Sequence, residues 1–201
     1  QKALSLIARE EVKIVGSGRT DAGVHALGQV AHFCVGKELN LYRVQGSLNG
    51  LLPPDIRILK LEPTTESFHA KYSALGKIYR YHLYTDPVLS PFRKGYAWHL
   101  PYPLDVGKMM AAAAYVKGTH DFTSFANEAH SGVAAHDPVR TVHRIDLVQE
   151  PGGFALEFEG DGFLYMMVRN IVGTLVEVAA GKRDPHSIPA LFDVKDRRQA
   201  G

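Results

Sequence analysis

The chain has 201 residues, of which 45% are hydrophobic and 22% charged, and its formal net charge is +2. This composition is typical of a globular protein and excludes a disordered or collagen-like chain. The small positive charge permits an anionic partner without requiring one. No run of about 18 uncharged apolar residues could span a membrane, and the first residues do not resemble a signal peptide. A single cysteine, Cys34, excludes an internal disulfide and a thiolate metal cluster. We therefore expect a cytoplasmic protein.

Residues 1–100 alternate short strands with helices. The patterns predict the end of a helix at 3–9, strands at 13–15 and 29–35, a helix at 41–51 behind the cap Asn40, and strands at 56–61 and 77–84. In the strand at 77–84, alternation places Tyr79 and Tyr81 on one face and Arg80 on the opposite face.

Residues 101–201 continue the mixture of helices and strands. The patterns predict a helix between the cap Asp105 and Gly118, a hairpin of 141–149 and 154–159, an apolar helix at 164–180, and a last helix after Asp184 and Pro185. This mixed order favours an α+β fold with a largely antiparallel sheet and helices on one face over a doubly wound parallel fold.

The glycine-rich loop at 16–23 is the first candidate site. It has neither the lysine of a phosphate-binding P-loop nor the glycine spacing of a dinucleotide site. Its glycines can simply form a turn with positive φ in which Arg19 and Asp21 are solvated. Alternatively, the loop presents both side chains to a substrate. Because Arg19, Asp21 and His25 lie within seven residues between two apolar strands, we favour the second interpretation.

Arg169 is the second candidate, because it occurs within an apolar helix. A buried guanidinium requires an acceptor, although the side chain could also extend along the helix to solvent. The acidic residues in apolar or glycine-rich surroundings that could face it are Asp21, Asp121, Asp146 and Asp161.

Other residues give weaker indications. Tyr79 and Tyr81 can pack a sheet or stack on nucleobases. The ten histidines do not have the spacing of a metal site, so we expect no metal and interpret them as solvated or structural. Cys34 lies in an apolar strand and is expected to be a buried, inert thiol.

Four motifs together resemble a known family. They are GSGRTDAGVHALGQVAHF at 16–33, FHAKYSA with KIYRY at 68–81, HDFTSF at 120–125 and FLYMMVRNIVG at 163–173. Their order and sequences are similar to those of the tRNA pseudouridine synthase A family, and they extend over nearly the whole chain.

This resemblance implies roles for particular residues. It assigns the catalytic carboxylate to Asp21, the motif tyrosine to Tyr79 and the closing arginine to Arg169. From its position two residues before Asp21, we infer that Arg19 helps to hold the extruded nucleotide or fills its vacated place. Arg80 and Arg140 are further RNA contacts that we infer, together with Lys71 and Lys77. Asp21 would attack the ribose or assist glycal formation, and in either route it must be ionised.

The resemblance also implies a fold, a substrate and an assembly. The fold is a largely antiparallel sheet from two similar halves, here 1–100 and 101–201, with flanking helices and a central cleft. Relative to the family, we expect a first strand and a last strand to be missing. The expected activity is isomerisation of uridine to pseudouridine at positions 38, 39 and 40 in the anticodon stem-loop of tRNA, by a homodimer without a cofactor.

Two other functions are compatible with parts of the sequence. A non-catalytic RNA-binding module of the same fold would share the motifs but form no product. A glycosidase could use Asp21 and Asp161 as paired carboxylates, because Asp161 lies between two glycines. The four motifs favour the synthase.

Overall fold

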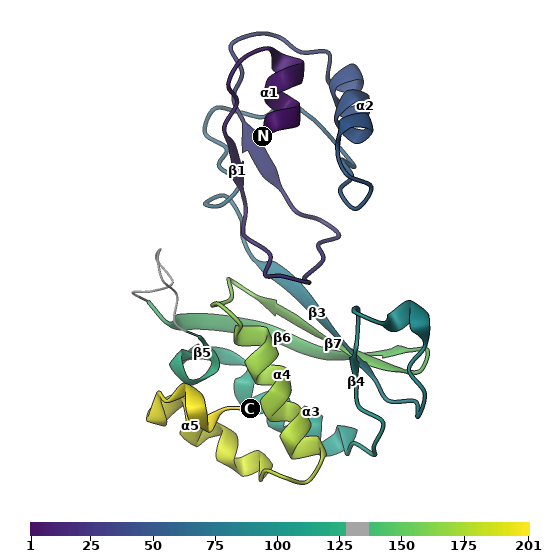
Figure 1. The fold of residues 1–201 in the computed structure, drawn as a ribbon. Helices are drawn as coiled ribbons and strands as arrows, with labels where there is room; N and C mark the ends of the chain where they lie inside the picture. Colours follow the sequence, from purple (N-terminus) through teal and green to yellow (C-terminus); the bar gives the residue numbers. More distant parts are fainter. Residues whose placement is uncertain (128–136) are drawn as a thin grey trace. The chain divides into compact units, whose positions relative to one another are not determined.

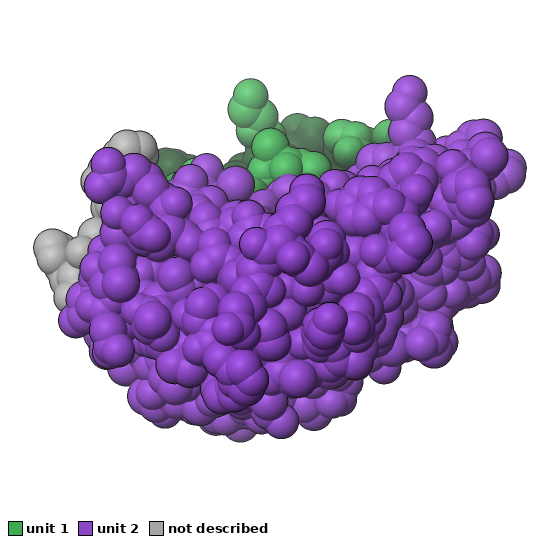
Figure 2. All heavy atoms as spheres, turned by 90° about the horizontal axis from the view of Figure 1, so that it is seen from below, with its two compact units in different colours: residues 1–74 green, residues 75–201 purple. Residues whose placement is uncertain are grey.

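The computed structural model describes residues 1–127 and 137–201, in two compact units of residues 1–74 and 75–201 (Figure 2). His130, His136 and most of the glycine- and alanine-rich segment before Arg140 lie outside the described residues. The units divide earlier than the halves expected at 1–100 and 101–201. Strand β3 (Lys77–Tyr84) is the reason, because it pairs along its whole length with β7 (Gly153–Gly160) and so belongs to the second unit.

The first unit packs two helices beside a two-stranded ribbon (Figure 1). Its elements are α1 (Lys2–Ala8), β1 (Ile14–Gly16), β2 (Ala31–Phe33) and α2 (Leu41–Leu51). The strands are antiparallel and pair Val15 with His32. Leu4, Val44 and Leu48 are buried between the helices. The side chain of Asn40 accepts a hydrogen bond from the Arg43 amide, which confirms the predicted cap.

The strand predicted at 56–61 is wrong, because this segment forms no ladder with another strand. Side-chain amides of α2 take the place of a neighbouring strand. Asn49 donates to the carbonyl of Ile58 and accepts from its amide, and Gln45 donates to the carbonyls of Ile58 and Leu59. The apolar alternation of the segment therefore reflects packing against α2.

The second unit contains a five-stranded sheet with the order β4-β3-β7-β6-β5. The strands that complete it are β4 (Trp98–His99), β5 (Gly118–Asp121) and β6 (Val139–Glu150). Neighbours are antiparallel except β3 and β4, which are parallel. The α+β class and the largely antiparallel sheet are therefore confirmed, as is the hairpin of β6 and β7, whose turn places Gly152 at φ 79°.

Helices α3 (Val106–Val116) and α4 (Met167–Ala179) pack together on one face of this sheet (Figure 1). The short helix α5 (Ile188–Val194) packs against α3, and the 3₁₀ turns are η1 (Pro91–Arg93), η2 (Thr123–Phe125), η4 (Pro185–Ser187) and η5 (Arg197–Gln199). Leu156 and Phe158 of β7 are fully buried with Ile171 of α4. No helix of the described residues is long and apolar enough to cross a bilayer.

Helix α4 begins three residues later than the predicted 164–180. Met166 has φ 62°, a left-handed conformation that a residue other than glycine seldom adopts, and the helix starts directly after it. Gly181, with φ 72°, follows its C-terminal end as expected. The strained backbone at Met166 separates the segment that contains Tyr165 from the first turn of α4, which bears Arg169.

Candidate active site

The glycine-rich loop lies at the tip of the hairpin formed by β1 and β2. The amide of Ser17 donates to the carbonyl of Val30, so the ladder extends one pair beyond the strands, and Gln29 closes the base by donating to the carbonyl of Gly18. The loop of residues 17–30 is therefore held at its two ends, and its centre projects from a fixed base.

Asp21 occupies a tight turn within this loop. Its carbonyl accepts from the amide of Val24, and Gly23 has φ 78°, which is the position of a type II turn that requires glycine. The positive φ that the turn interpretation requires therefore occurs at Gly23 and does not occur at Gly16 or Gly18. Asp21 is half-buried and Arg19 is exposed.

A histidine joins the hairpin to the second motif. Nδ1 of His32, on β2, accepts a hydrogen bond from the amide of Ala70 at 3.1 Å. The ring of His32 also lies 4.8 Å from that of His69 and edge-on to Phe68. His32 and Ala70 are 38 residues apart in sequence, so two of the motifs form one structure beside the base of the Asp21 loop.

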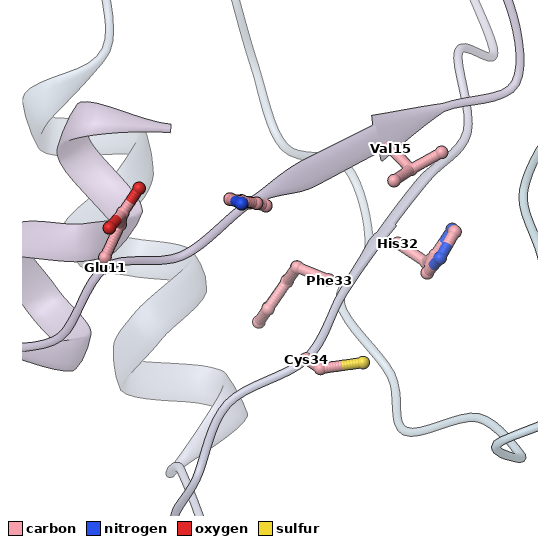
Figure 3. A pocket seen from close by; sticks show the side chains of 6 residues that line it. Glu11, Val15, His32, Phe33 and Cys34 are labelled. Carbon is pink, nitrogen blue, oxygen red and sulfur yellow. The ribbon is translucent and has the colours of Figure 1, made fainter.

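His32 and Cys34 line a shallow pocket of about 380 Å³ along this ribbon (Figure 3). Figure 3 shows both side chains pointing away from Phe33, which packs into the core of the first unit. The buried thiol expected at Cys34 is wrong, because the side chain lies on the solvent side of the alternating strand and is exposed.

In the second unit, Tyr79 and Arg169 lie on the helix-bearing side of the sheet. The ring of Tyr79 meets that of Phe163 edge-on, with centroids 5.0 Å apart. Burial raises the pKa of the neighbouring Tyr81 hydroxyl, and the charge of Arg169 opposes this rise. Arg169 is itself half-buried. Aromatic rings and a guanidinium therefore meet where β3 faces the first turns of α4.

The acidic candidates of the second unit have partners other than Arg169. Asp121 pairs with Lys195 at 2.7 Å, Asp146 pairs with Arg144, and Asp161 accepts from the amide of Thr141. Burial alone would raise the pKa of Asp121, but hydrogen bonds from Lys195 and Thr123 outweigh it, so the pKa lies below its usual value. Within residues 75–127 and 137–201, the ion pairs do not include Arg169.

Arg80 does not lie with this group. Arg80 is on the opposite face of the sheet, where it forms an ion pair with Glu157 at 2.6 Å, as the strand alternation predicted. Arg140, at the start of β6, donates to the carbonyls of Asp137 and Val139. Their roles as RNA contacts stay predictions.

The sequence patterns did not predict the contacts of His32 and His69, because the histidines were interpreted together as solvated or structural. Their occurrence inside the first and second motifs was the signal that could have found them. In the described residues, no three histidine, cysteine or acidic side chains gather to hold a metal ion.

Comparison with known proteins identifies the family. A family model described as tRNA pseudouridine synthase matches residues 1–73 and 111–201. The chain belongs to this family. The tRNA pseudouridine synthase A 1 of Protochlamydia amoebophila is 56% identical over 201 residues, covering all of this chain and 78% of the relative. The tRNA pseudouridine synthase A of Bacillus pumilus is 46% identical over 192 residues, covering 96% and 76%, and that of Bacillus subtilis is 40% identical over 203 residues, covering 100% and 81%.

Proposed function

We propose that this chain is an isomerase that converts uridine to pseudouridine in tRNA, with Asp21 as its catalytic carboxylate. The observation that carries this proposal is the family membership over nearly the whole chain, including the two segments that hold Asp21 and Arg169. We further infer that the substrate uridines are those at positions 38, 39 and 40 of the anticodon stem-loop, and that the enzyme works as a homodimer. Its location in the cytoplasm stays a prediction.

The reaction breaks the C–N bond between ribose C1′ and N1 of the base and joins C1′ to C5 of the same base. The proton on C5 is lost and N1 gains one, so the product is an isomer and no oxidant or group donor takes part. The protein must supply an ionised carboxylate, retain the detached base, and accept the C5 proton. Asp21 serves as the carboxylate, and Tyr79 stacks on the base or takes the proton.

Arg169 pairs with Asp21 in this proposal. The support comes from elimination, since Asp121, Asp146 and Asp161 have other partners within their own unit. A half-buried guanidinium is stabilised by an ionised acceptor, and the same contact would place a positive charge beside the Asp21 carboxylate. Arg19, exposed two residues before Asp21, would hold the extruded nucleotide or fill its place in the stack, which costs a few kcal/mol to vacate.

The direct test is to incubate the chain with unmodified tRNA and to map pseudouridine in the anticodon arm. Asp21→Asn preserves size and removes the charge, so it should abolish product while tRNA affinity stays within a few fold. Asp55→Asn makes the same change at an exposed turn of the same unit and should leave turnover unchanged. Substantial product from Asp21→Asn would contradict the assignment of Asp21. Binding without product by the unaltered chain would instead identify an RNA-binding module.

A further inference from the structure

Tyr72 is a large aromatic side chain that is 74% exposed yet held in place. Its ring stacks on His69, with centroids 4.3 Å apart and planes inclined by 27°. One face of the ring is therefore covered by the imidazole, while most of the side chain remains open to solvent. An exposed tyrosine with this support contrasts with Tyr42 of α2, which is 88% exposed and has no ring contact among the described residues.

The backbone beneath Tyr72 is fixed by the same imidazole. Nδ1 of His69 accepts from the amides of both Lys71 and Tyr72 at 3.2 Å. The amide of His69 donates to the Ser73 hydroxyl, and the Ser73 amide donates back to the His69 carbonyl. Stacking therefore adds to a closed set of hydrogen bonds, so the ring keeps its orientation without a bound partner.

The Tyr72 segment is also tied to the strand that leaves the Asp21 loop. His32 accepts from the Ala70 amide and its ring lies against His69. His32 follows Ala31, which pairs with Gly16 at the base of that loop. The Tyr72 segment and the Asp21 loop are thus both attached to the β1–β2 ribbon of the first unit.

We propose that Tyr72 is a stacking platform for an unpaired nucleobase of the RNA substrate, with Lys71 contacting the adjoining phosphate. Every nucleobase offers a π face to such a ring, independent of sequence. The Lys71 ammonium lies over the Tyr72 ring, 5.5 Å from its centre, so a base that stacks on this ring displaces the ammonium toward the adjoining phosphate. The inference rests on the proposed function, because it takes the RNA to be the substrate.

The experiment measures the affinity of the full chain for unmodified tRNA and the rate of pseudouridine formation at saturating tRNA. Loss of one base stack weakens binding about tenfold to a hundredfold, so Tyr72→Ala should lower affinity by that factor while the saturated rate stays within a few fold. Tyr72→Phe should restore affinity, because the π face is retained. Tyr42→Ala is the matched control and should bind as the unaltered chain does.

Two further measurements separate stacking from charge and from misfolding. Tyr72→Ala should leave the salt dependence of binding unchanged, whereas Lys71→Gln should reduce its slope by about one phosphate contact. The indole introduced by Tyr72→Trp should lose fluorescence when tRNA binds, after subtraction of the signal from Trp98 in the unaltered chain.

Equal affinities of Tyr72→Ala and Tyr42→Ala, or an unquenched indole, would overturn the platform and leave the proposed function standing. A chain that neither binds tRNA nor forms product would overturn both.

Discussion

In the proposed mechanism, the guanidinium of Arg169 pairs with the carboxylate of Asp21. Arg169 is half-buried on α4, and the three acidic residues of the second unit that the sequence made candidates for it are engaged by Lys195, Arg144 and a backbone amide. If it pairs with Asp21, the two residues act as one unit in the reaction. Effects of such residues are strongly non-additive.

A double-mutant cycle tests this pairing. We expect Arg169→Gln to lower turnover by about a hundredfold or more, as loss of one charged active-site contact does. Combining it with Asp21→Asn should add little to the loss from Asp21→Asn alone. Single-turnover rates at saturating tRNA provide the measurement, and Arg198→Gln, at an arginine whose side chain is 88% exposed, is the control. Independent, multiplying losses would show that Arg169 acts elsewhere.

Two substitutions of Tyr79 distinguish a role of its hydroxyl from a role of its ring. Because the ring packs on Phe163, Tyr79→Ala should reduce turnover by at least about a hundredfold through loss of both base stacking and proton transfer. Tyr79→Phe should keep tRNA affinity and lose turnover. Tyr84→Phe, on the opposite face of the same strand, is the control. Unchanged activity in Tyr79→Ala would leave the tyrosine with a packing role alone.

At the scale of elements, the sheet of the second unit has two unlike faces. One packs α3 and α4, and the other carries an ionic network in which Glu157 of β7 accepts from Arg80 of β3 and Arg144 of β6. Hydrogen bonds from Arg80 and then Arg144 hold the pKa of Glu157 below its usual value. These contacts cross three adjacent strands, so they stabilise the register of the sheet.

This network predicts a particular acid sensitivity. Because the pKa of Glu157 is lower in the folded state, its contribution is fully present above the unfolded value of about 4.3 and is lost as the pH falls through the folded value. Glu157→Gln should lower the thermal midpoint by a few degrees near neutral pH, and the difference should disappear in acid. Circular dichroism melts at several pH values test this, with Glu66→Gln of the first unit as control. A difference that persists in acid would assign the effect to packing.

At the scale of the whole molecule, a net charge of +2 is small for a protein that binds a polyanion. Two copies would combine their basic residues, and Arg19, Lys71, Lys77 and Arg140 are the exposed or half-buried candidates. Arg80 is a weaker candidate, because Glu157 already neutralises it. Because the charge of one copy is small, we predict a homodimer.

The salt dependence of tRNA binding and the mass in solution test this assembly together. Each neutralised phosphate releases counterions, so affinity should fall at least about tenfold between about 50 mM and about 200 mM salt. Light scattering should give twice the mass of one chain. A monomer that binds tRNA independently of salt would contradict the prediction.

Local sequence patterns were sufficient to predict many of the helices and strands and to select the candidate site residues. The bounds of α2 and β3 and the caps Asn40 and Asp105 agree with the structure, because helix spacing, strand alternation and capping involve residues only a few positions apart. The motif resemblance likewise named Asp21, Tyr79 and Arg169 without any coordinates, since motif residues are read directly from the sequence.

Tertiary contacts decided what local patterns could not. The segment at 56–61 has the alternation of a strand, yet amides of Asn49 and Gln45 bind its backbone in place of a neighbour. Likewise, the exposure of Cys34 and the bond from Ala70 to His32 depend on which segments meet in space. The sequence by itself determined the family, most of the local elements and the candidate residues. The tertiary structure alone decided which partners satisfied the polar groups, because hydrogen bonds between distant segments leave no periodic trace along the chain.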